Sequence, residues 1–166
     1  VPENSVAALV EAQKLGVYGS EFDVYVTLDN EVILYHNASF SGTEVAGNAQ
    51  WKGKRPDSCN YSEIKDYKLA NGEPLPTLND YLVQAQKYPN TKLILEIKTH
   101  NSAEKNMRAA RTCFEMVKAK NMQHQVEYIA FSYDICKELV RLDPNAMVQY
   151  LNGDKAPATV LAAGIR

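Results

Sequence analysis

The stretch SEFDVYVTLDNEVILYH, residues 20–36, decides the fold, because it reads as two short strands around a turn at residues 27–30. Its first half alternates apolar and polar side chains, as a strand does. Its second half, which ends at His36, is a nearly continuous apolar run. Such a run is typical of a strand in a sheet that is buried on both faces. We therefore expect a buried sheet around this stretch.

The first strand also carries two acids, Glu21 and Asp23. Side chains two residues apart in a strand point to the same face, about 7 Å apart along the chain. Two neighbouring carboxylates repel each other unless a cation or a base lies between them. The pair is therefore either solvated at an edge strand or part of a site for a hard divalent cation.

Outward from this stretch, helical and strand patterns alternate. A helical pattern with Pro2 and Asn4 ahead of it ends at Gly16. Thr77 is a candidate cap for a helix at 77–88. The remaining expected elements are a strand at 92–98, a helix at 101–121, a strand at 125–132, a helix at 133–144, a strand at 146–151 and a helix at 156–164. This alternation predicts a parallel sheet with crossover helices.

Residues 37–76 interrupt the alternation. They are rich in Gly, Ser, Asn and Pro, and only residues 61–67 have a helical pattern. The segment is too long for a simple connection in a compact domain. We interpret it as an insertion that lies over an active face.

Composition narrows the class of protein. The chain has 166 residues, 45% of them hydrophobic and 23% charged, with a net charge of −2, which are values of one globular domain. No basic run indicates nucleic-acid binding, and no apolar run approaches the ~20 residues of a membrane span. Three widely spaced cysteines without a CxxC motif indicate buried or free thiols. The first residue is not methionine, so the compartment stays open, as does the oligomeric state.

A third acid, Glu96, stands in the apolar run LILEIK, with Lys98 two residues later. The two could form a surface ion pair of little energetic value. The apolar neighbours of Glu96 indicate burial instead, where an unpaired acid is costly. His36 alone could equally be a core histidine. In a barrel of alternating strands and helices, catalytic groups gather at the carboxyl ends of the strands, where His36, Glu96 and Lys98 are expected.

Five blocks of the chain appear in the order of a known family. PENSVAAL, SEFDVYVTLDNEVILYHN, PLPTLNDYL, LILEIK and YIAFSYDICKELVRLDP resemble the successive blocks of the glycerophosphodiester phosphodiesterases. Each block is weak alone. The E-x-D strand, the strand ending in His and the later L-E-I-K strand are highly specific together, and the resemblance covers most of the chain.

The resemblance implies a (β/α)8 TIM barrel, of which this chain covers about strands two to six, with residues 37–76 inserted after the third strand. It implies that Glu21, Asp23 and Glu96 hold one divalent cation, Mg²⁺ or Ca²⁺. It makes His36 a general acid and base, and it places Lys98 at the phosphate. The implied substrate is a glycerophosphodiester, which is cleaved through a cyclic phosphate to glycerol 3-phosphate and an alcohol.

Two departures from the family pattern lead to alternatives. The family carries a His-Arg-Gly motif just ahead of the PENS block, with a second histidine, and this chain starts after that position. We therefore expect a portion of a longer polypeptide. Asn37 stands where the family usually has Asp, which alters a hydrogen bond near the site. The alternatives are a non-catalytic cation-binding or scaffold fragment, and a relative that acts on another phospholipid phosphodiester.

Overall fold

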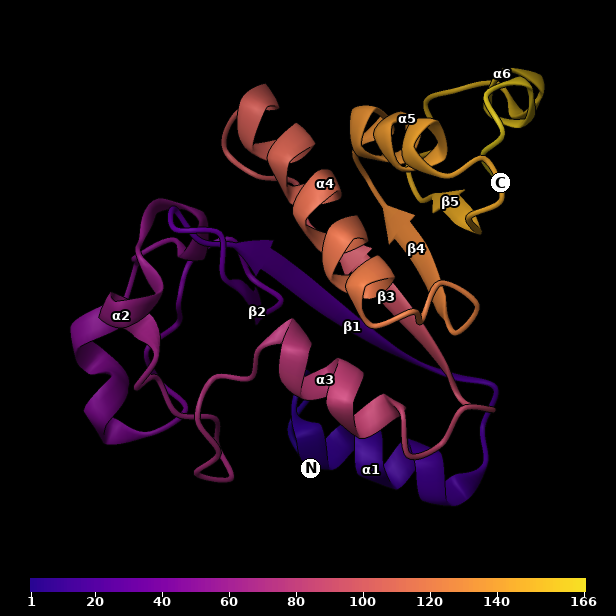
Figure 1. The fold of residues 1–166 in the computed structure, drawn as a ribbon. Coiled ribbons are helices and arrows are strands. Elements are labelled where there is room, and N and C mark those ends of the chain that lie inside the picture. Colours follow the sequence, from indigo (N-terminus) through magenta and orange to yellow (C-terminus); the bar gives the residue numbers. More distant parts are fainter.

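The computed structural model describes residues 1–166 and contains one five-stranded sheet (Figure 1). Its strands are β1 (Gly19–Val26), β2 (Val32–Leu34), β3 (Lys92–Ile97), β4 (Val126–Ala130) and β5 (Val148–Tyr150). Its α-helices are α1 (Val6–Leu15), α2 (Tyr61–Ile64), α3 (Leu78–Ala85), α4 (Ala103–Ala119), α5 (Tyr133–Leu142) and α6 (Pro157–Ala162). Two 3₁₀ helices span Ala46–Trp51 and Pro56–Ser58.

The sheet is mixed, with the strand order β2-β1-β3-β4-β5. Strands β1, β3, β4 and β5 are parallel, as the alternation predicts, with crossover helices between them. Strand β2 is antiparallel to β1, and Val24 lies opposite Leu34. The expectation of a wholly parallel sheet is therefore wrong for β2. The physical reason is the connection at 27–31, which is too short for a parallel crossover and instead closes a hairpin.

The ends of the helices follow their capping residues. The Ser5 hydroxyl accepts a hydrogen bond from the backbone N–H of Ala8 and caps α1, which ends at Gly16 in the left-handed conformation, at φ 69°. Thr77 caps α3 in a reciprocal capping box with Asp80, as expected. None of the helices combines the length and the hydrophobicity that a membrane span requires.

The two faces of the sheet have different surroundings. The helices cover one face, and the side chains that alternate along β1 and β3 toward that face form the main core. Its strand residues include Phe22, Val24, Val26, Leu93, Leu95 and Ile97, all fully buried. The intervening positions, which include Glu21, Asp23 and Glu96, lie on the opposite face because strand side chains alternate. The acids are therefore kept apart from the apolar core.

Residues 37–76 form a separate layer beside β2, around the short helix α2 (Figure 1). The expected helix at 61–67 is present over Tyr61–Ile64. A second hydrophobic cluster fills this segment, and its ring pairs include Phe40 and Tyr67, with centroids 4.5 Å apart. Tyr25 of β1 and Ile33 of β2 belong to the same cluster. The segment is therefore anchored to the hairpin, and β2 is covered on both of its faces.

Candidate active site

Three acids lie close together on the face of the sheet that the helices do not cover. Strands β1 and β3 are parallel neighbours, and their register places Asp23 beside Glu96. Glu21, two residues before Asp23, joins them, and one carboxylate oxygen of each acid lies within 4.8 Å of the others. Lys98 follows the end of β3, with its Nζ 2.9 Å from Oε2 of Glu96. The structure thus brings together four of the five residues expected at the site.

The acids of this carboxylate cluster differ in exposure and protonation. Asp23 and Glu96 are 4% and 8% exposed, whereas Glu21 keeps contact with solvent. Burial of its carboxyl end and the negative charge of Asp23 nevertheless raise the pKa of Glu21 to about 7. The charge of Glu96 adds to this shift, and the Lys98 ammonium opposes it. Without a further cation, the cluster therefore holds a proton on Glu21 near neutral pH.

The donor set fits a hard divalent cation. Oε2 of Glu96 is buried and accepts no hydrogen bond, because its close approach to Lys98 does not have hydrogen-bond geometry. A buried carboxylate oxygen without a hydrogen bond is costly unless another positive partner takes it. Mg²⁺ and Ca²⁺ are bound through carboxylate oxygens of this kind. The residues present are therefore suited to hold such an ion.

Asn4 belongs to the site although its sequence position indicated only the start of a helix. Its side chain donates from Nδ2 to Oδ2 of Asp23 at 3.1 Å. Its Oδ1 accepts from the backbone N–H of Asp23 at 2.8 Å. A polar residue two positions before a helix is common in proteins, so this position did not predict a role for Asn4 at the site. Only its place in the PENS block of the family could have indicated that role.

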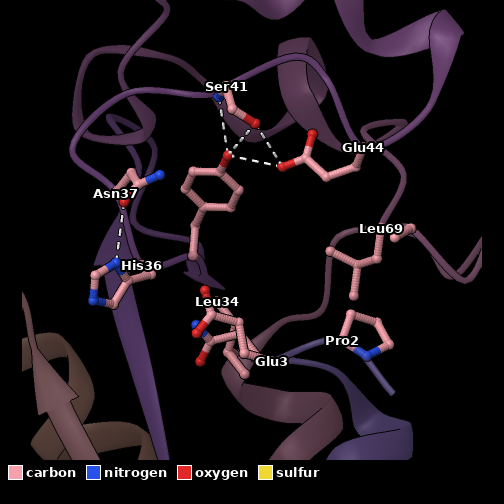
Figure 2. Close-up of a pocket in the computed structure, with 11 residues that line it drawn as sticks. Pro2, Glu3, Leu34, His36, Asn37, Ser41, Glu44 and Leu69 are labelled. Atoms are coloured by element: carbon pink, nitrogen blue, oxygen red, sulfur yellow. Dashed lines mark hydrogen bonds between the residues drawn. The ribbon is translucent and has the colours of Figure 1, made fainter.

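His36 lies two residues beyond the end of β2, whereas it was expected to close that strand. The backbone N–H of Tyr35 donates to the carbonyl of Asp23 at 3.2 Å, which keeps the following residue beside β1. The imidazole is exposed, and its Nδ1 lies 3.1 Å from Oδ1 of Asn37 (Figure 2). Because an amide oxygen can only accept, Nδ1 donates in this arrangement and Nε2 keeps its lone pair. No direct contact joins His36 to the three acids.

A cavity of about 140 Å³ lies beside His36. It is lined by residues 2–4, 34–37, 41, 44 and 69–70. Figure 2 shows His36 and Asn37 together on one side of it, with Ser41 and Glu44 on another. The lining contains no lysine or arginine. Residues 37–76 therefore contribute part of the lining of a cavity next to the histidine.

Neither of the other two histidines can serve as a second proton carrier at this site. His100 is buried, its Nε2 accepts from the backbone N–H of Val26 at 2.9 Å, and its Nδ1 lies 2.7 Å from the Lys98 carbonyl. Burial lowers the pKa of His100, so this ring is neutral and structural. His124 precedes the start of β4, whereas Lys98 follows the end of the parallel strand β3, so the two lie at opposite ends of the strands. His36 is thus the one histidine of this chain that is exposed and lines this cavity.

Comparisons with a family model, with solved structures and with a curated protein all identify the same family. Residues 1–163 match the family model described as the glycerophosphoryl diester phosphodiesterase family. A solved glycerophosphodiester phosphodiesterase from Parabacteroides distasonis is 42% identical, with a TM-score of 0.88, and the match covers 98% of this chain and 63% of that one. A probable glycerophosphodiester phosphodiesterase 2 from Mycobacterium tuberculosis is 26% identical over 68% of this chain and 39% of its own length.

A third similar protein is a phosphodiesterase from Oleispira antarctica, solved in complex with the product sn-glycerol-3-phosphate. It is 19% identical, with a TM-score of 0.82, over 99% of this chain and 67% of that one. These close matches are TIM-barrel enzymes, which confirms the expected fold class. The chain spans about 60% of the length of the Parabacteroides structure. On the family match and the 42% identity, this chain belongs to the glycerophosphoryl diester phosphodiesterase family.

Proposed function

We propose that the protein hydrolyses glycerophosphodiesters to glycerol 3-phosphate and an alcohol, with one divalent cation held by Glu21, Asp23 and Glu96. The main support for the proposal is the cluster of three carboxylates beside Lys98 on two parallel strands. The chain also matches the glycerophosphoryl diester phosphodiesterase family. The names of the Parabacteroides and Mycobacterium relatives support this substrate class. The product bound to the Oleispira enzyme is consistent with it.

Each residue has a chemical task in this reaction. In this proposal the Lys98 ammonium, whose side chain is 17% exposed, attracts the phosphodiester anion to the cluster. The glycerol 2-hydroxyl attacks phosphorus, the bond to the alcohol breaks, and a cyclic phosphate remains. His36 takes the proton of the attacking hydroxyl on Nε2, and an acid protonates the departing alcohol. Water then opens the cyclic phosphate by the reverse proton transfers. When bound, the cation supplies Lewis-acid stabilisation of the charge on the phosphoryl oxygens.

The experiment that tests the proposal uses the protein expressed from its complete gene and a panel of glycerophosphodiesters with cationic, neutral and anionic alcohols. Phosphorus NMR separates the diester, the cyclic phosphate and glycerol 3-phosphate. We expect glycerol 3-phosphate to form, and His36→Ala to slow its formation by about 10²–10⁴-fold. Excess EDTA should stop the reaction, and Mg²⁺ or Ca²⁺ should restore it.

Two outcomes would contradict the proposal. Full turnover in excess EDTA would exclude the cation from the chemistry. Binding of Mg²⁺ or Ca²⁺ without turnover of any diester would favour the non-catalytic alternative. A matched control is His124→Ala, which removes an imidazole at the opposite end of the strands and should leave the rate unchanged.

A further inference from the structure

Asn4 holds Asp23 at two points. Its Oδ1 accepts from the backbone N–H of Asp23 at 2.8 Å, and its Nδ2 donates to Oδ2 of the same residue at 3.1 Å. Asn4 is 8% exposed and Asp23 is 4% exposed, so water competes little for either bond. The pair of bonds fixes both the strand position and the rotation of the carboxylate.

We infer that Asn4 is a positioning residue that presets the Asp23 carboxylate for a cation, an inference that rests on the proposed cation site. The amide occupies Oδ2 of Asp23, which leaves Oδ1 for another partner. A carboxylate held in one rotation loses less side-chain entropy when it binds an ion. Partners that orient metal ligands in this way commonly change metal affinity by 10–100-fold when they are removed.

The backbone around Asn4 supports a side-chain role. Asn4 has φ 52°, in the left-handed region that glycine adopts without strain. Asparagine tolerates this region better than most residues, and it adds an amide that glycine lacks. The next residue, Ser5, caps α1, and its carbonyl accepts from the Tyr81 hydroxyl at 2.6 Å. The backbone that follows Asn4 is therefore held by α1 and α3, while the Asn4 amide holds Asp23 on β1.

A second asparagine makes the same kind of contact away from the site and serves as the matched control. Asn48, 1% exposed, donates from Nδ2 to the Lys68 carbonyl at 2.7 Å and accepts on Oδ1 from the Lys68 N–H at 3.0 Å. It joins two parts of residues 37–76 and touches none of the three acids. Its loss should therefore lower stability without a direct effect on the cation site.

The test compares Asn4→Gly, Asn4→Ala and Asn48→Ala with the wild type, each expressed from the complete gene. Calorimetric titration with Mg²⁺ alone and with Ca²⁺ alone gives the cation Kd, and thermal unfolding in EDTA gives the stability of the cation-free fold. We expect both Asn4 variants to weaken cation binding by about 10–100-fold. Asn48→Ala should lower the unfolding temperature and leave the Kd unchanged.

The Asn4→Gly variant separates the effect of losing the side chain from the effect of straining the backbone. Asn4→Gly removes both hydrogen bonds and accepts the positive φ, whereas Asn4→Ala adds backbone strain and should unfold at a lower temperature. If the alanine variant does not fold, the glycine variant still gives the Kd. A folded Asn4→Gly protein with wild-type Kd would overturn the inference, as would an equal loss of affinity in Asn48→Ala. A wild-type protein that binds neither cation would overturn the proposed cation site itself.

Discussion

The protonation state of Glu21 depends on its burial and on the charged groups around it. Burial of its carboxyl end and the charge of Asp23 raise its pKa to about 7, above the ordinary value of 4.5. Folding therefore favours the protonated form, which stabilises the cation-free protein at acidic pH. This contribution is lost as the pH rises from about 4.5 through about 7, because the folded protein must then carry a third negative charge in the cluster.

A bound cation reverses the preference for the protonated form, so we predict that binding releases a proton from Glu21. The affinity for Mg²⁺ or Ca²⁺ should rise with pH between about 5 and 7.5, because the protonated carboxyl group must lose its proton before it can coordinate the ion. Calorimetric titration in two buffers of different ionisation enthalpy measures the number of protons released. Glu21→Gln should bind more weakly and release fewer protons. An affinity that does not change across this pH range would contradict the assignment of Glu21.

Residues differ in how much of their role could be predicted. Glu21, Asp23 and Glu96 were identifiable because acids in apolar strands are costly, and period-two spacing places them on one face. The pairing of β1 with β3, which joins Asp23 to Glu96, depends on the sheet order, and spacing within one strand does not contain it. The two bonds from Asn4 to Asp23 join residues 19 positions apart and depend on its left-handed backbone.

Among the elements, the segment 37–76 contains one carboxylate, Glu44, that is surrounded by hydroxyl donors. Glu44 accepts hydrogen bonds from the hydroxyl groups of Tyr67, Tyr35 and Ser41. Burial alone would raise its pKa, but hydrogen bonds from Tyr67, from the backbone of Glu44 itself, from Ser41 and from Tyr35 outweigh burial and lower the pKa to about 2. Tyr67 is fully buried in the cluster that joins this segment to the β1–β2 hairpin. The charged form of Glu44 therefore stabilises the layer beside His36.

We predict that Glu44→Gln destabilises the protein by on the order of 1–2 kcal/mol, since hydrogen bonds to a charged acceptor are lost and this site is partly solvated. This corresponds to about 2–4 °C in unfolding temperature per kcal/mol for a domain of this size. The stabilisation is present above pH 4.5 and is lost as the pH falls toward 2, because Glu44 is then protonated. Thermal unfolding from pH 7 to pH 3 measures both effects.

Asp66→Asn is the matched control, because it removes an exposed carboxylate of the same segment. It should leave the unfolding temperature nearly unchanged. Equal losses of stability in Glu44→Gln and Asp66→Asn would show that net charge, and not the hydroxyl network, accounts for the effect.

The elements themselves were largely predictable. Gly16 after α1 and the Thr77 cap of α3 were predicted, because they act through local backbone conformation and hydrogen bonds; the cap of α1 is Ser5, which was not singled out. The direction of β2 was not inferred, although the short connection at 27–31 contains that information. The packing of residues 37–76 onto Tyr25 and Ile33 is a tertiary contact, and no periodic pattern of the sequence indicates it.

For the whole molecule, the position of the site follows from the difference between the two faces of the sheet. The helices bury one face of the four parallel strands, so the acids at the alternate positions gather on the other. Lys98 then lies at the carboxyl edge of β3, where barrel enzymes place their catalytic groups. The alternation of elements predicted the parallel strands and their crossover helices, whereas the division into a helix-covered face and a face with acids comes from the structure. The family match covers residues 1–163.

The most direct test of cation-assisted hydrolysis is the rate of glycerol 3-phosphate release by Glu96→Gln, compared with Glu127→Gln. Glu127 lies on β4 opposite Ile94, in the same layer of the sheet as Glu21 but outside the carboxylate cluster. With saturating Mg²⁺ or Ca²⁺, Glu96→Gln should lose at least about 10²-fold in rate, because a proposed ligand of the cation is gone, and Glu127→Gln should retain wild-type activity. Wild-type turnover by Glu96→Gln in the presence of EDTA would contradict the assignment of these carboxylates to a catalytic cation.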